Sequence, residues 1–480
     1  MKLAVLAAAI AGIAQSAIVF PAAAWARDKA AETPIAFEAR SGETVDAFRG
    51  AFEVPENRAD KDSRMLTLHY VRFPATRENP GAPIVYLAGG PGGSGIWTAE
   101  GRRFPLFMAM REFGDVIAFD QRGTGASRDT EECASSIILD DAAPISDAGF
   151  MEAHREALRE CLRLWRAQGV DPRGYTTLES VADLDALRRH LGADTLSLWG
   201  ISYGSHLALA AIREMGDRLD RIVIASAEGL AQTVKQPART DDYVDRLQAA
   251  INAKTDAMPD IKALMRRVHE RLEAEPLTLE LPQENGETAT VLFERRDMQR
   301  LASGMIADPG RFAFRLIELY AALDAGEPGP LAALLARWHE PNEPISYNVM
   351  SVMMDVASGV GEDRRRMIEA QARTSLLGPY LNDTLYVAEA APEYDLGDAF
   401  REKPAGDTPL LLLSGTLDGR TYIESQREAV SGLANRQTVT VVNAGHNLFM
   451  ASPEVTAAIQ AFMRGGDVSG REIVVDLPDF

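Results

Sequence analysis

The chain has 480 residues, of which 46% are hydrophobic and 25% are charged. These proportions exclude a disordered or fibrous protein. Asp and Glu outnumber Lys and Arg by 70 to 50, which gives a formal net charge of −20. Such a chain repels a nucleic-acid backbone, so no nucleic-acid partner is expected. The two cysteines are too few for a cysteine-rich zinc site.

Residues 1–26 have the pattern of a secretory signal peptide. A short basic start that contains Lys2 precedes an almost wholly apolar run over 3–20, and 24–26 form an A-x-A cleavage site. This pattern predicts cleavage and export to the periplasm or the medium. The alternative is an uncleaved membrane anchor, because the apolar run approaches the spanning length of about 20 residues. After cleavage no stable membrane insertion is expected, and the oligomeric state stays open.

Export would place the two cysteines, Cys133 and Cys161, in an oxidising compartment, where disulfides persist. We therefore expect them to pair. The alternative is two free thiols that pack as small hydrophobic side chains.

Short apolar runs predict strands along much of the remaining chain. They lie at 51–55, 65–73, 84–88, 116–119, 196–199, 221–225, 409–413 and 438–442. Helical segments separate most of these runs; one example is 176–191, which opens on a capping box formed by Thr176 and Glu179. Continuous apolar strands that alternate with helices indicate an α/β fold, with a mostly parallel sheet and helices on both faces.

The strand pattern is interrupted between two parts of this core, at 34–229 and 408–480. The intervening segment, 230–407, is predicted to be a mainly helical cap domain. Its expected helices lie at 241–253, 259–272, 311–323 and 331–339, and its strand-like patches at 277–281 and 288–293. Ligands bind outside the carboxyl ends of parallel strands, so the insertion is expected to cover the site.

Ser202 is the candidate nucleophile. It lies in the G-x-S-x-G motif over 200–204, between the strand at 196–199 and a helical run at 206–215. In this context the motif predicts a tight turn that lifts the serine hydroxyl above the sheet, at the N-terminus of the helix. The alternative is a tight turn with no catalytic role.

A serine nucleophile needs a base, and His446 is the candidate among seven histidines because it follows the last strand of the sheet. Asp418 follows the penultimate strand and would orient the imidazole. The resulting order of serine, acid and histidine is the one expected for this type of fold. Asp418 followed by Gly419 could also form an Asx turn, and the two roles are compatible.

The glycine-rich stretch 88–95 follows the strand at 84–88 and is the candidate oxyanion loop. The backbone N–H groups of Gly90 and of Tyr203 are the expected donors. The alternative, a phosphate-binding loop, is disfavoured because no P-loop lysine follows.

Several motifs together resemble a known family. They are Y-L-A-G-G-P-G-G-S-G (86–95), D-Q-R-G-T-G (120–125), L-W-G-I-S-Y-G (198–204), G-T-L-D (415–418) and A-G-H-N (444–447). They are similar to those of exported α/β-hydrolases of the proline iminopeptidase and tripeptidyl aminopeptidase group, which are S33-like serine peptidases. The resemblance implies an α/β-hydrolase fold with a large, mainly helical cap. It also implies removal of residues from free peptide N-termini, and the cysteine pair matches the exported subgroup.

An aminopeptidase must recognise a cationic N-terminus, which a carboxylate does well. Glu228 and Asp355 are the candidates, although both could be solvated or structural carboxylates. The substrate is expected to be a peptide, or alternatively a small acyl ester or amide cleaved by the same residues. A non-catalytic binding protein is a third hypothesis. No metal and no cofactor is expected to take part.

Overall fold

A computed structural model describes residues 32–255, 259–283 and 286–477. The predicted signal peptide lies outside these residues, so its cleavage stays a prediction. Within the described ranges, no helix is both long enough and apolar enough to cross a membrane.

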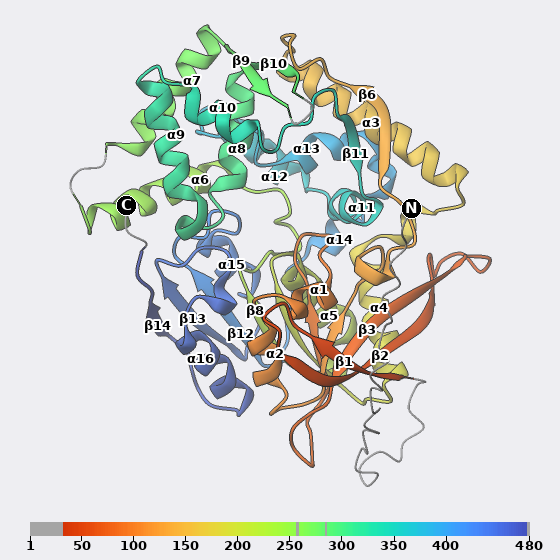
Figure 1. Cartoon of the computed structure of the whole chain (residues 1–480). Coiled ribbons are helices and arrows are strands. Elements are labelled where there is room, and N and C mark those ends of the chain that lie inside the picture. Colours follow the sequence, from red (N-terminus) through yellow and green to blue (C-terminus); the bar gives the residue numbers. More distant parts are fainter. Residues whose placement is uncertain (1–31, 256–258, 284–285, 478–480) are drawn as a thin grey trace, which may run out of the picture.

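A ten-stranded sheet runs through the lower half of the molecule as drawn in Figure 1, in the order β1-β2-β3-β5-β4-β7-β8-β12-β13-β14. The strands are β1 (Thr33–Glu38), β2 (Thr44–Pro55), β3 (Met65–Phe73), β4 (Ile84–Leu87), β5 (Val116–Phe119), β7 (Leu196–Ile201), β8 (Leu219–Ala225), β12 (Leu410–Gly415), β13 (Arg436–Val442) and β14 (Arg471–Val474). The pairings from β1 to β5 are antiparallel, and all those from β5 to β14 are parallel. The mostly parallel sheet expected from the sequence is confirmed.

Helices cover both faces of this sheet, as the alternation along β12 shows. Leu410 and Leu412 join one hydrophobic cluster, whereas Leu411 and Leu413 join the other. The helices outside the insertion are α1 (Gly95–Glu100), α2 (Phe104–Met110), α3 (Asp147–Ala167), α4 (Thr177–His190), α5 (Tyr203–Met215), α15 (Ile423–Ala429) and α16 (Pro453–Met463). Helices α3, α4 and α5 supply the first cluster, and α2 and α16 supply the second. Burial on both faces explains why the central strands are continuous apolar runs.

The segment between β8 and β12 is mainly helical and lies over one end of the sheet (Figure 1). Its elements are α6 (Pro237–Asn252), α7 (Ile261–Ala274), β9 (Leu277–Pro282), β10 (Thr288–Phe293), α8 (Arg295–Met305), α9 (Phe314–Asp324), α10 (Gly329–Leu335), β11 (Pro344–Tyr347), α11 (Val349–Ser358), α12 (Glu362–Ala372), α13 (Asp383–Val387) and α14 (Asp398–Arg401). Most of a third hydrophobic cluster comes from α6 to α10. Whether 230–407 is a separate domain stays a prediction.

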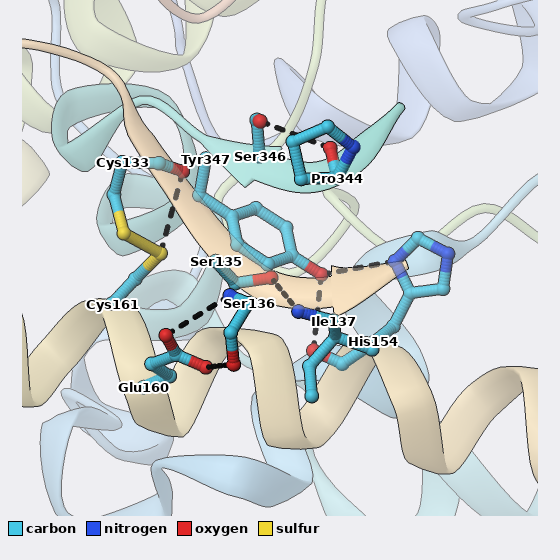
Figure 2. The surroundings of a disulfide bond; sticks show 10 residues. All are labelled: Cys133, Ser135, Ser136, Ile137, His154, Glu160, Cys161, Pro344, Ser346 and Tyr347. Carbon is cyan, nitrogen blue, oxygen red and sulfur yellow. Dashed lines mark hydrogen bonds between the residues drawn. A yellow bond between two sulfur atoms is a disulfide. The ribbon is translucent and has the colours of Figure 1, made fainter. Parts of the chain in front are cut away.

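The insertion also contacts a segment that the sequence analysis assigned to the core. Strand β6 (Cys133–Ile138) pairs antiparallel with β11 of the insertion, with Cys133 opposite Tyr347. The expected disulfide joins Cys133 to Cys161 on α3, with the two Cα atoms 5.7 Å apart (Figure 2). The Tyr347 hydroxyl lies 3.0 Å from His154 Nδ1, also on α3. The cross-linked unit of β6 and α3 therefore packs on one side of the insertion.

Candidate active site

Ser202 sits on a sharp turn between the end of β7 and the start of α5. Its backbone adopts φ 55° and ψ −127°, a conformation that is strained for a residue with a side chain. A Cβ atom on Gly204 would lie 2.0 Å from the Leu87 carbonyl oxygen, and one on Gly200 would lie 2.6 Å from the Gly204 carbonyl oxygen. The turn therefore closes only because glycine stands on both sides of Ser202.

His446 and Asp418 are in direct contact. Both oxygens of the Asp418 carboxylate lie 3.1 Å from His446 Nδ1. Asp418 is fully buried, whereas the side chain of His446 is partly open to a cavity. A carboxylate on Nδ1 leaves Nε2 of the same ring available to exchange a proton.

Further hydrogen bonds hold the Asp418 carboxylate. Its Oδ1 accepts from the backbone N–H groups of Arg420 and Thr421 at 2.9 and 2.8 Å, which is the Asx-turn geometry considered above. Its Oδ2 accepts from the Thr421 hydroxyl at 2.7 Å. Burial alone would raise the pKa of Asp418, but His446 and these donors hold the pKa below its usual range. Thr421 was not identified from the sequence, since a threonine three residues after an aspartate is a common pattern.

Because the pKa of Asp418 is low, its contribution to the stability of the fold is expected to depend on pH. The ionised carboxylate contributes stability above its unfolded pKa of about 3.8, and this contribution is lost as the pH falls through the lower folded pKa. We expect Asp418→Asn to melt below the wild type at pH 7 and this difference to shrink at pH 3. Thermal melting at the two pH values measures it. An equal difference at both would show that the charge of Asp418 does not stabilise the fold.

The backbone of His446 is held by the core and by the insertion. Its N–H donates to the Ala307 carbonyl at 2.9 Å, and its carbonyl accepts from the Ser226 hydroxyl at 2.7 Å. Ser226 itself adopts φ 51° directly after β8. A Cβ atom on Gly445 would lie 2.6 Å from Pro309 Cδ, so glycine lets the insertion approach this loop. These contacts fix the position of the imidazole relative to the sheet.

Ser202 and His446 line the same cavity, of about 540 Å³. In the described part of the chain, no hydrogen bond joins the Ser202 hydroxyl to the imidazole; such contacts are often long in free enzymes and tighten with substrate. His206, one turn after Ser202 on α5, is fully buried with its Nε2 3.3 Å from the Ser358 hydroxyl. Burial lowers the pKa of His206 to about 4. His446 is therefore the better placed of the two histidines to act as a base.

The glycine-rich loop lies against Ser202. A Cβ atom on Gly89 would lie 3.0 Å from Ser202 Cβ, and Gly90 lines the same cavity with φ +127°. The Ser94 hydroxyl anchors the loop by donating to Asp120 Oδ1 at 2.6 Å. Tyr203, the second expected donor, is the first residue of α5. Of the two residues named from the sequence as donors, Tyr203 thus directly follows the serine and Gly90 lines the same cavity.

Glu228 and Asp355 line this cavity as well, so the fold brings both candidate amine ligands to the serine. Glu228 is buried and forms an ion pair with Lys235, a partner that the sequence analysis missed. Burial would raise the pKa of Glu228, but Lys235, followed by His206, holds it below its usual range. Asp355, on α11, also lines a neighbouring cavity of about 470 Å³. A cation thus compensates Glu228, a feature that has no signal in the sequence.

The D-Q-R-G-T-G motif contacts the glycine loop and links distant elements. Arg122 is fully buried, and its guanidinium donates to both oxygens of Asp183 on α4, at 2.6 and 2.7 Å. It also donates to the Glu56 carbonyl at 2.6 Å. The motif therefore supports the site without lining the cavity.

Two family models match the chain, one described as alpha/beta hydrolase fold over residues 82–312 and one as TAP-like protein over 383–474. The chain has the α/β-hydrolase fold. The first model covers β4, the glycine loop and the Ser202 turn, and the second covers Asp418 and His446. Among the described residues, this hydrolase has no group of three or more His, Cys, Asp or Glu side chains that could hold a metal ion.

Several curated relatives of the chain are named as peptidases. Serine protease Hip1 of Mycobacterium tuberculosis (strain ATCC 25618 / H37Rv) is 30% identical over 187 residues, which cover 38% of the hydrolase and 36% of the relative. Tripeptidyl aminopeptidase of Streptomyces coelicolor is 28% identical over 193 residues, covering 37% and 34%. Proline iminopeptidase of Xanthomonas citri is 32% identical over 142 residues, covering 30% and 31%. The hydrolase thus spans only about a third of each relative's length in these matches. The family resemblance seen in the sequence is confirmed.

Proposed function

We propose that this hydrolase is an exported serine aminopeptidase that removes residues from free peptide N-termini. One observation carries the proposal. A single cavity is lined by Ser202, by His446 with its buried carboxylate partner, and by the two further carboxylates Glu228 and Asp355. The first two residues supply acyl-transfer chemistry, and the carboxylates supply negative charge for a substrate ammonium group.

In the proposed reaction, Ser202 Oγ attacks the carbonyl carbon of the scissile bond while His446 Nε2 takes its proton. The N–H groups of Gly90 and Tyr203 donate to the oxyanion that forms. His446 then gives the proton to the leaving nitrogen, and the C–N bond breaks to leave an acyl-enzyme. Water, deprotonated by His446, attacks the ester, and the released serine takes the proton back.

The proposal predicts selective effects on amine recognition. Asp355→Asn and Glu228→Gln are each expected to raise KM for substrates with a free N-terminus by about tenfold, because each removes one charge-assisted contact. The matched measurement uses the N-acetylated form of the same substrate, whose KM should not change. Glu228→Gln also leaves Lys235 without its ionic partner, so thermal melting must accompany the kinetics. Equal effects on free and acetylated substrates would refute amine recognition.

The ion pair between Glu228 and Lys235 favours a second candidate function. A carboxylate that already has a cation attracts a substrate ammonium less strongly, which weakens Glu228 as a ligand for an amine. The same nucleophile and base would then serve small acyl esters or amides that carry no amine. This esterase-like function needs no change in the acyl-transfer steps.

Three chromogenic substrates separate the two candidates. They are a peptide anilide with a free N-terminus, its N-acetylated form, and a short-chain nitrophenyl ester, each assayed with the mature protein. Preferential turnover of the free-N-terminus anilide supports the aminopeptidase. Turnover of the ester with failure of both anilides would overturn it in favour of the esterase.

Export is part of the proposal and is supported by the signal-like pattern of residues 1–26 and by the disulfide between Cys133 and Cys161. The test is mass spectrometry of the protein recovered from periplasm and medium. An N-terminus at Arg27 is expected, and recovery of the uncleaved chain in the cytoplasm alone would contradict export.

A further inference from the structure

A second and larger cavity adjoins the site. It measures about 1230 Å³, compared with about 540 Å³ for the cavity that contains Ser202. Thr98, Arg103 and Asn447 line both cavities, so the two spaces share a boundary. Pockets for small ligands measure about 300–1,000 Å³, so the larger cavity exceeds what a small acyl compound requires.

The larger cavity lies on the histidine side of Ser202. Four of the residues that line it, Asn443, Ala444, Gly445 and Asn447, belong to the loop that carries His446. In acyl transfer by serine, the histidine protonates the leaving nitrogen, so the leaving group departs toward the histidine. Glu228 and Asp355, by contrast, line only the smaller of these two cavities, where the acyl part of the substrate would sit.

We propose that the 1230 Å³ cavity binds the leaving portion of a peptide substrate, meaning the chain on the C-terminal side of the scissile bond. This inference rests on the proposed function and adds a second binding region to it. Arg103 lies at the boundary between the two cavities, where it donates to Asn447 Oδ1 at 3.2 Å and to the Tyr86 hydroxyl. A leaving chain would pass Arg103 to reach the larger cavity.

The lining suits a peptide rather than a ligand of one charge. Three arginines and three carboxylates contribute to it: Arg40, Arg102, Arg103, Glu43, Asp308 and Asp476. Trp97 on α1 is 62% exposed, and the Arg40 guanidinium lies 4.3 Å from its ring centroid. An exposed aromatic face with polar neighbours is a typical contact for a peptide side chain. The balanced charges select neither a polyanion nor a polycation.

The test varies only the leaving group. The substrates share one free-N-terminus acyl part, chosen as the alanyl, prolyl or trialanyl group that the enzyme cleaves fastest as an anilide. They carry an anilide or one, two or four amino acids on the leaving side, and product release is followed by mass spectrometry. For the wild type, kcat/KM is expected to rise from the one-residue to the four-residue leaving chain, chiefly through KM.

Trp97→Ala is expected to lower kcat/KM for the four-residue leaving chain, relative to the anilide, by about three- to tenfold. Trp97→Phe, which keeps an aromatic face, should retain most of the wild-type ratio. The matched control is Trp338→Ala, which removes a tryptophan that is 80% exposed and lines neither cavity. Its ratio should equal that of the wild type.

Either of two results would overturn the inference. One is a kcat/KM of the wild type that does not change with the length of the leaving chain. The other is a Trp97→Ala variant whose kcat/KM for the four-residue leaving chain, relative to the anilide, equals that of the wild type. Failure of the aminopeptidase proposal is seen separately, as equal cleavage of the free and acetylated anilides. Neither anilide has a leaving peptide chain to occupy the larger cavity.

Discussion

Ser202→Ala is expected to lower kcat by about 10⁵- to 10⁶-fold, because removal of the nucleophile leaves only binding and oxyanion stabilisation. The turn that presents Ser202 depends on Gly200 and Gly204 and on the backbone of Ser202, none of which the substitution alters. The smaller alanine also fits the space beside Gly89. The variant should therefore fold and bind substrate while failing to turn it over. Steady-state kinetics with the best anilide or ester measures the loss.

Ser136→Ala is the matched control, because it removes a hydroxyl that donates to Glu160 at the exposed surface of β6. It should leave kcat at the wild-type value. Thermal melting of both variants separates a loss of chemistry from a loss of folding. A residual kcat above about one per cent of wild type in folded Ser202→Ala would place the nucleophile elsewhere.

The strands next to the site were predictable because they are buried on both faces. The apolar runs at 84–88 and 116–119 correspond to β4 and β5 within one residue. The Ser202 turn was predictable for another local reason, since glycine at both flanking positions of a strand-to-helix turn is a steric requirement. The positions of Asp418 and His446 were predictable from the sheet topology, because the carboxyl ends of strands in a parallel sheet meet at one edge.

The charge balance of the site was not predictable from the sequence. Lys235 follows Glu228 by seven residues, and no periodicity distinguishes this pair among 70 acidic and 50 basic residues. In the folded chain the Lys235 backbone N–H donates to Asn382 Oδ1 at 2.6 Å, and the lysine side chain contacts the Glu228 carboxylate. Ser226, which binds the His446 carbonyl, has no local signal either.

The pairing between β6 and β11 was also not predictable from the sequence. The two strands are about 200 residues apart, and each is short and only partly buried. Strand propensity in such segments depends on packing against neighbours that the sequence does not identify. The cystine was expected from export, but its place beside the insertion required the structure (Figure 2).

His446→Ala is expected to lower kcat by about 10⁵- to 10⁶-fold, nearly as much as Ser202→Ala, because serine without its base is a poor nucleophile. The two residues act as one unit, so the double variant should be no slower than either single variant within about threefold. The contact between His446 Nδ1 and Asp418, at 3.1 Å, places the proton-exchanging Nε2 on the cavity side.

The control histidine is His154, on α3, whose Nδ1 lies near Tyr347 and which lines neither the site cavity nor the larger cavity beside it. His154→Gln should retain wild-type kcat. A loss below tenfold in His446→Ala would mean that another group accepts the serine proton. Additive losses in the double variant would mean that Ser202 and His446 contribute to separate steps, and the proposed acyl-transfer unit would then be wrong.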